Sequence, residues 1–211
     1  YLLVTQDQSA VILYEFTGCM HLADDLETVT EVRPAITASF VAAGDEIKRR
    51  EMDWAAEIAS TLTELVGKGA TVGIERINAG AVQALSGYGF FLVDAQQPIE
   101  RARAIKSQEE VACVKASLYA TEIAVARLRQ SLRPGLSENA LWSILHQAVI
   151  AQNGDYVETR LLSSGQRTNP WFQESGKRLI GKNELVALDT DVVGCYGYYA
   201  DFSRTFHSGP D

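Results

Sequence analysis

The sequence predicts an α+β protein, with a smaller α/β domain over residues 1–100 and a second domain over residues 101–211. Two observations carry this prediction. In the first part, β-rich runs alternate with a helical pattern, which is typical of α/β domains. In the second part, two amphipathic helical patterns precede β-rich runs around a Gly-x-x-Gly turn, which indicates helices packed on an antiparallel sheet.

The first domain is expected to open with a hairpin, because the β-rich runs 1–5 and 10–16 are separated by a polar turn. A long helix is predicted over 47–66, since apolar residues recur on one face and Gly67 follows its end. The remaining expected elements are a strand over 70–75, a short helix over 78–85 and a strand over 90–93.

The second domain is predicted to begin after a polar connector over residues 98–104. Ser107, with Glu110 three residues later, has the pattern of a capping box and therefore marks a helix start. Arg133-Pro-Gly135 ends this helix, because proline cannot continue it.

A second helix is predicted from Ser137 to near Asn153, followed by a strand over 157–163. His146 lies among apolar neighbours of this helix, which favours packing over a role as a metal ligand.

Composition indicates a soluble globular protein, with 46% hydrophobic and 22% charged residues and no apolar run long enough for a membrane span. The net charge of −8 argues against nucleic acid or an anionic membrane surface as a partner. Three separated cysteines and a start that lacks a basic signal region favour reduced thiols and a cytoplasmic location.

The strongest functional signal is a set of three carboxylates, Asp189, Asp191 and Asp201, on either side of the Gly-x-x-Gly turn. Strand side chains alternate between faces, so Asp189 and Asp191 point the same way. If the chain turns about Cys195 and Tyr196, Asp201 comes opposite Asp189, and all three carboxylates share one face. Such crowding is unfavourable unless a cation neutralises it, which indicates half of a metal site.

Acids beside a turn are also common as solvated surface groups. The apolar run 185–188 directly before Asp189 favours a metal site over that alternative, without excluding it.

The pattern Asp-x-Asp…Gly-x-x-Gly-Tyr-x-x-Asp-x-x-Arg-Thr over 189–205 resembles the metal hairpin of the pita-bread family, which includes methionine aminopeptidases, Xaa-Pro peptidases and creatinase. Ile105-Lys-Ser-Gln-Glu-Glu110 and Arg133-Pro-Gly-Leu-Ser-Glu138 resemble two further motifs of that family. The resemblance implies an incomplete pita-bread catalytic domain over 101–211, preceded by a creatinase-like N-terminal domain. It also implies that the remaining ligands, and the catalytic base, lie beyond Asp211 in a longer enzyme.

The spacing of the acids indicates a branch of this family. The peptidases place two hairpin aspartates eleven residues apart, whereas eleven residues before Asp201 this chain has Thr190, bracketed by Asp189 and Asp191. This arrangement is similar to that of the dimethylsulfoniopropionate lyases of the DddP type. The resemblance implies that Asp189, Asp191 and Asp201 bind divalent metal; it favours iron, and carboxylate ligands also suit Mn, Co or Zn.

Two residues are candidates for substrate binding. Peptidases of this fold usually carry a histidine a few residues after a Ser-Gly, but the loop after Gly165 contains Trp171 and Phe172 instead. Aromatic faces attract organic cations, so Trp171 would suit a sulfonium zwitterion, although core packing of both aromatics is the alternative. Tyr199 shares the face of the three aspartates and is the second candidate.

Three functions remain open. The leading interpretation is a lyase that cleaves dimethylsulfoniopropionate to dimethyl sulfide and acrylate. A metallopeptidase or amidohydrolase, such as an Xaa-Pro dipeptidase or ectoine hydrolase, is the second, and a catalytically silent binding protein is the third. Proteins that this chain resembles are commonly homodimers, which is the assembly we expect.

Overall fold

The computed structural model describes residues 1–209, and the chain divides into two compact units, Tyr1–Ile105 and Lys106–Asp211. Each unit has its own buried apolar cluster. Among the described residues, no helix has the length and apolar composition needed to cross a bilayer.

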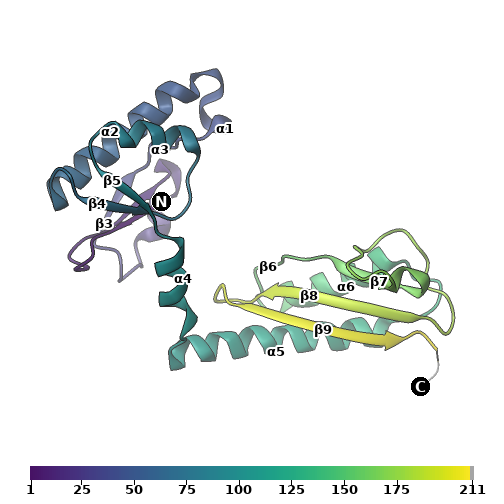
Figure 1. Cartoon of the computed structure of the whole chain (residues 1–211). Coiled ribbons are helices and arrows are strands. Elements are labelled where there is room, and N and C mark those ends of the chain that lie inside the picture. Colours follow the sequence, from purple (N-terminus) through teal and green to yellow (C-terminus); the bar gives the residue numbers. More distant parts are fainter. Residues whose placement is uncertain (210–211) are drawn as a thin grey trace. The chain divides into compact units, whose positions relative to one another are not determined.

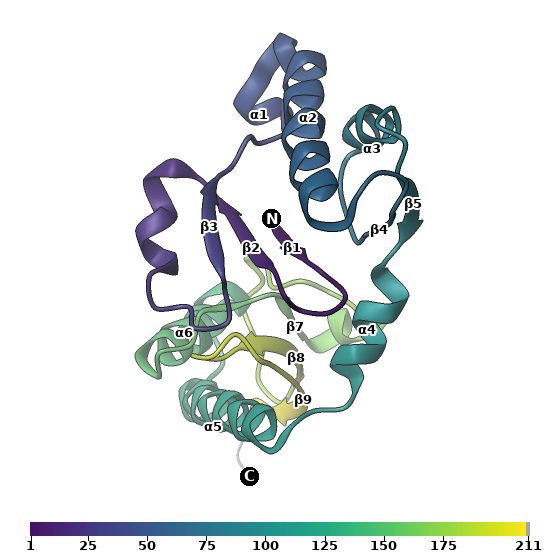
Figure 2. The same ribbon diagram turned by 90° about the vertical axis from the view of Figure 1, so that its left-hand side faces the viewer.

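The N-terminal unit contains two small sheets (Figures 1 and 2). In the first, β1 (Leu2–Val4) and β2 (Val11–Glu15) form the expected antiparallel hairpin, and β3 (Glu31–Pro34) runs parallel to β2. In the second, β4 (Thr71–Ile74) pairs in parallel with β5 (Phe91–Asp94).

The helices of this unit are short except for α2 (Ile47–Val66), whose bounds are those that the apolar pattern predicts. Trp54, Ile58 and Leu62 of α2 are buried in the cluster that also holds Tyr14 of β2. The shorter helical segments are η1 (Thr17–Ala23), α1 (Phe40–Ala43), η2 (Gly44–Glu46), α3 (Ala79–Ser86) and α4 (Gln96–Ala104).

The polar connector expected over 98–104 is wrong, because these residues belong to α4. Pro98 lies in the first turn of α4, where a missing N–H leaves no intrahelical hydrogen bond unmade. The Glu, Arg and Ala residues that follow are good helix formers.

The C-terminal unit begins with two helices, α5 (Gln108–Ser131) and α6 (Glu138–Ala151). The predicted capping box is confirmed, since Ser107 Oγ accepts from Glu110 N while the Glu110 carboxylate accepts from Ser107 N. Ser137 caps α6 with its hydroxyl, which accepts the backbone N–H of Ala140.

The sheet of this unit is built around β8 (Leu185–Val193). The antiparallel strand β9 (Tyr199–His207) lies along one edge of β8 (Figure 1). Along its other edge lie β6 (Tyr156–Val157) and β7 (Leu161–Ser164), so the single strand expected over 157–163 is interrupted. Between β7 and β8 the chain forms the short 3-10 turn η3 (Gly165–Thr168) and a long loop.

One face of the sheet packs on α5 and α6. Val186, Leu188 and Val192 of β8 are buried among the apolar residues of both helices, with Phe202 and Phe206 of β9 packed beside them. Side chains of alternate residues point to the opposite face, and these include the three aspartates.

Candidate metal centre

The β8–β9 hairpin brings the three predicted aspartates onto one face. Asp191 pairs directly with Asp201, and Asp189 lies two residues before Asp191 on the same side of β8. Asp189 and Asp191 are half-buried, whereas Asp201 is exposed. Arg204 lies on the opposite face, with its guanidinium carbon 3.9 Å from the centre of the Phe202 ring.

The expected pairing of Asp201 with Asp189 is wrong, because Asp201 faces Asp191 and Asp189 faces Ser203. The chain reverses over Gly194–Tyr198, and Gly197 adopts a φ of +73° that favours glycine. The turn is therefore centred on Tyr196, half to one residue later than expected. Because the turn is displaced, every residue of β9 has a different partner on β8 from the one expected.

The backbone of Asp191 defines how closely the two acids approach. Glu158 N–H donates to the Asp191 carbonyl at 2.9 Å, and Asp191 N–H donates to Thr159 Oγ1 at 3.2 Å. Both backbone groups of Asp191 thus point away from β9, so Asp191 and Asp201 form a non-hydrogen-bonded pair. In such pairs the Cα atoms are only about 4.5 Å apart and the side chains are closest.

A hydroxyl group donates to each aspartate of β8. Thr159 Oγ1 lies 2.9 Å from Asp191 Oδ2. Ser203 Oγ, directly across the hairpin, donates to Asp189 Oδ1. These contacts orient the two carboxylates without neutralising their charge.

The donor set fits a hard or borderline divalent cation in chemistry, because all three groups are carboxylates and two of them form a directly opposed like-charged pair. Across residues 1–209, however, no three His, Cys, Asp or Glu side chains already lie together as a formed ligand set. The face therefore presents three carboxylates that would form a metal site only together with further ligands.

The loop after β7 carries the aromatic pair, and neither side chain is buried. Trp171 is 48% exposed and Phe172 is 72% exposed, so core packing is wrong for both. Phe172 lines a cavity of about 800 Å³ together with His146, Thr159 and Glu174. Thr159 also hydrogen-bonds to Asp191, so this cavity lies next to the candidate metal ligands.

Tyr199 forms a pair that sequence reasoning missed. Its hydroxyl lies 3.1 Å from the hydroxyl of Tyr156, and this hydrogen bond is the main cause that raises the pKa of Tyr199 to about 12. Both tyrosines pair with Val193 from opposite sides, so they share the face of the acids. The alternation that placed Tyr199 could not show Tyr156, because the partner strand was not known.

Glu138 is a second residue that sequence reasoning did not assign to the site. It is fully buried at the start of α6; its Oε1 accepts from Ser164 N at 2.9 Å, and its Oε2 accepts from Gly176 N at 3.0 Å. The Arg167 guanidinium also donates to Oε2. One carboxylate therefore ties both ends of the loop that carries Trp171 to the helix.

His146 packs against Trp142 with ring centres 5.5 Å apart, in agreement with the packing interpretation. Burial lowers the pKa of His146 below its ordinary value.

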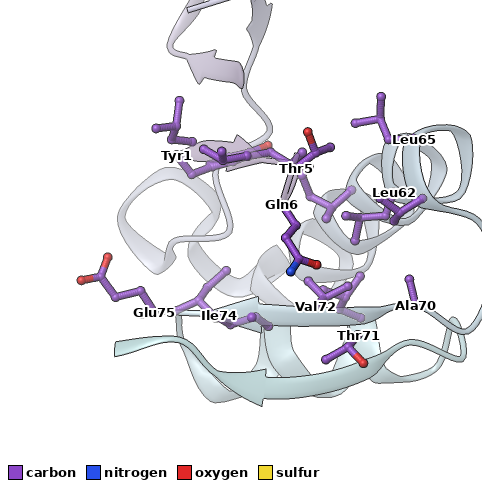
Figure 3. A pocket seen from close by; sticks show the side chains of 18 of the residues that line it. Tyr1, Thr5, Gln6, Leu62, Leu65, Ala70, Thr71, Val72, Ile74 and Glu75 are labelled. Carbon is purple, nitrogen blue, oxygen red and sulfur yellow. The ribbon is translucent and has the colours of Figure 1, made fainter. Parts of the chain in front are cut away.

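The N-terminal unit holds a separate cavity of about 780 Å³ (Figure 3). It lies between β1 and β4 and is lined by apolar side chains of α2, with the Gln6 side chain extending into it. Its ionisable lining residues are Tyr1 and, directly after β4, Glu75 and Arg76, and these three do not form a cluster of catalytic groups. The hairpin aspartates therefore remain the candidate site.

Comparisons with known proteins relate the chain to metal-dependent enzymes. Residues 112–211 match the model of Metallopeptidase family M24. Over 204 residues the chain is 31% identical to dimethylsulfoniopropionate lyase DddP of Roseovarius nubinhibens. This alignment covers 94% of this chain and 46% of that protein.

Solved structures show the same fold. The prolidase of Pyrococcus horikoshii OT3 matches with a TM-score of 0.78 at 18% identity, over 100% of this chain and 55% of that one. The Xaa-Pro dipeptidase of Bacillus anthracis matches with a TM-score of 0.77 at 19% identity, over 99% of this chain and 54% of that one. At these identities the likeness shows the fold alone, and it confirms the expected incomplete pita-bread fold.

The chain spans about half the length of the proteins it matches, with shares of 46%, 54% and 55%. Most of α5, all of α6 and the β8–β9 hairpin lie in the part that the family model matches. Through this part, from residue 112 onward, the chain is similar to metallopeptidase family M24.

Proposed function

We propose that this chain carries part of the active site of a metal-dependent dimethylsulfoniopropionate lyase, with Asp189, Asp191 and Asp201 as metal ligands. The observation that carries the proposal is the direct opposition of Asp191 and Asp201, with Asp189 on the same face. Similarity to the DddP lyase supports it, since the chain is 31% identical to that protein over most of its own length.

Asp189, Asp191 and Asp201 would hold the metal, for which iron is favoured by the resemblance and Mn, Co or Zn would also suit. When bound, it would supply positive charge for the substrate carboxylate and for the charge that develops beside it. The three aspartates of this chain hold that charge on the half-exposed face of the hairpin. In the reaction a base removes the proton on the carbon next to the carboxylate, and that electron pair forms the C=C bond of acrylate. Dimethyl sulfide leaves with the electrons of the C–S bond.

Aromatic residues of this chain would bind the sulfonium end of the substrate. Trp171 is exposed on the loop held by Glu138, and Tyr199 lies two residues before Asp201 on the same face. A zwitterion carries its two charges only a few atoms apart, so a cation-binding aromatic must lie close to the carboxylates. Tyr199 meets this requirement through the strand spacing of about 7 Å between alternate residues.

An Xaa-Pro dipeptidase or related amidohydrolase is the second candidate, and the match to a metallopeptidase family favours it. The assay that separates the two measures dimethyl sulfide in the headspace and proline release from Xaa-Pro dipeptides, using the complete protein loaded with Fe²⁺ or Mn²⁺. We expect dimethyl sulfide release, which the Asp191→Asn variant loses. Dipeptide hydrolysis without dimethyl sulfide would overturn the lyase proposal, and the lack of both activities would favour a silent binding protein.

The proposed assembly is a homodimer, on the resemblance to proteins of this fold. Sedimentation of the complete protein as a monomer at micromolar concentration would contradict it.

A further inference from the structure

The edge of β8 that faces β6 and β7 contains a β-bulge. Val157 pairs with Val192, and Leu161 pairs with Asp189. Between these pairs the β6–β7 side has three residues, 158–160, whereas β8 has only Thr190 and Asp191. The extra residue locally breaks the ladder, which is how bulges redirect a side chain.

The side chain redirected here is that of Thr159. Its hydroxyl takes the place of a ladder carbonyl and accepts the Asp191 backbone N–H at 3.2 Å. The same hydroxyl donates its proton to Asp191 Oδ2 at 2.9 Å. A threonine hydroxyl has one proton and two lone pairs, so both bonds are compatible at once.

Asp191 needs such a restraint because of its neighbour. Asp201 lies directly opposite in the closer of the two antiparallel pair types, where like charges repel. With no hydrogen-bond donor beside it, the Asp191 carboxylate would be free to change its orientation in response to this repulsion. The Thr159 hydroxyl bonds only one of the two carboxylate oxygens, Oδ2.

We propose that Thr159 is a positioning residue, which fixes the Asp191 carboxylate on the hairpin face so that Asp191 and Asp201 can bind one metal ion. The inference rests on the proposed function, because it assigns a role toward the proposed metal. It adds that the bulge at 158–160 serves this site rather than merely interrupting the sheet.

The test compares Thr159→Val, which removes the hydroxyl at nearly constant volume, with Thr159→Ser, which keeps it. The complete protein is stripped with a chelator and titrated with Mn²⁺ by calorimetry. Loss of a group that orients a metal ligand typically weakens metal binding by about 10- to 100-fold, which is the result expected for Thr159→Val. Thr159→Ser should bind within about 3-fold of wild type, because its hydroxyl makes both hydrogen bonds.

Thr205→Val is the matched control. Thr205 also lies on the acid-bearing face of β9, opposite Ala187, so its loss removes a strand hydroxyl away from Asp191. A general effect of such a change on the sheet would weaken Mn²⁺ binding in this variant as well, whereas we expect wild-type affinity.

Failure of the two proposals can be distinguished. Wild-type protein that binds no divalent metal would overturn the proposed metal function. Wild-type protein that binds Mn²⁺, with equal affinity in Thr159→Val, would overturn the role of Thr159 alone. Should Thr159→Val not fold, Thr159→Ala removes the same hydroxyl without a branched side chain, and wild-type affinity in that variant has the same meaning.

Discussion

Single residues hold the loop that carries Trp171 and the hairpin acids in place by hydrogen bonds. Glu138 accepts from backbone N–H groups at both Ser164 and Gly176, which lie on either side of Trp171. A buried carboxylate with several donors is costly to disrupt, because removing either partner leaves uncompensated polar groups. Trp171 is thus an exposed aromatic on an anchored loop, which suits a binding residue better than a mobile one.

Replacing Trp171 with Ala should raise KM about 2- to 30-fold, because one cation–π contact worth roughly 0.5–2 kcal/mol is lost. Steady-state kinetics of dimethyl sulfide release measures the effect. Because the side chain is 48% exposed, the melting temperature should change little.

Tyr196→Ala is the control for this change, since Tyr196 is an exposed aromatic of the β8–β9 turn. We expect its KM to equal that of wild type. A KM unchanged by Trp171→Ala would remove Trp171 from the substrate site.

At this scale the sequence predicts which residues share a face, but not which residues are partners. Alternation is a property of every strand, so Asp189, Asp191 and Asp201 could be placed together from their numbers alone. Thr159 could not be found in this way, because its contact depends on a bulge, and one extra residue leaves no mark in the apolar pattern.

At the scale of the elements, the β8–β9 turn approaches α5 so closely that there is no room for a side chain at Gly194. A Cβ on Gly194 would lie 2.8 Å from Ser117 Cα, closer than side-chain carbons approach a backbone. At the same turn, Tyr198 Oη donates to Glu110 Oε1 at 3.0 Å. This bond, after the larger effect of the Ser107 backbone N–H, lowers the pKa of Glu110.

Gly194→Ala should therefore lower the free energy of unfolding by about 1–3 kcal/mol through overpacking, measured by urea denaturation. Gly197→Asn is the control, because Gly197 has a φ of +73° with no neighbouring atom within 4 Å of the added Cβ, and asparagine tolerates that conformation. The free energy of unfolding of Gly197→Asn should fall by less than about 1 kcal/mol. Equal stability of Gly194→Ala and wild type would show that the hairpin can move away from α5.

Elements were predictable where several local signals agree. The apolar stripe and the glycine after it gave α2 its bounds, and Ser107 with Glu110 gave the start of α5. The stretch 98–104 lacks an apolar stripe, so its helix could not be recognised from periodicity. The division of one expected strand into β6 and β7 depends on pairing with β8, which is a long-range contact.

For the whole molecule, the two separate apolar clusters suggest two cooperative unfolding units. One cluster is centred on residues such as Leu62 of α2, the other on residues such as Leu145 of α6. Leu62→Ala and Leu145→Ala, each expected to cost about 2–5 kcal/mol, should lower different transitions in a calorimetric scan and so assign them.

Metal should then stabilise only the transition that Leu145→Ala lowers, because all three proposed ligands belong to Lys106–Asp211. A ligand that binds only the folded state at 100 times its Kd adds about 2.7 kcal/mol, which for a unit of this size raises Tm on the order of 10 °C. Asp191→Asn should abolish the rise, whereas Leu62→Ala should leave it unchanged. An equal rise in both transitions would show that the metal binds elsewhere or that the two units unfold together.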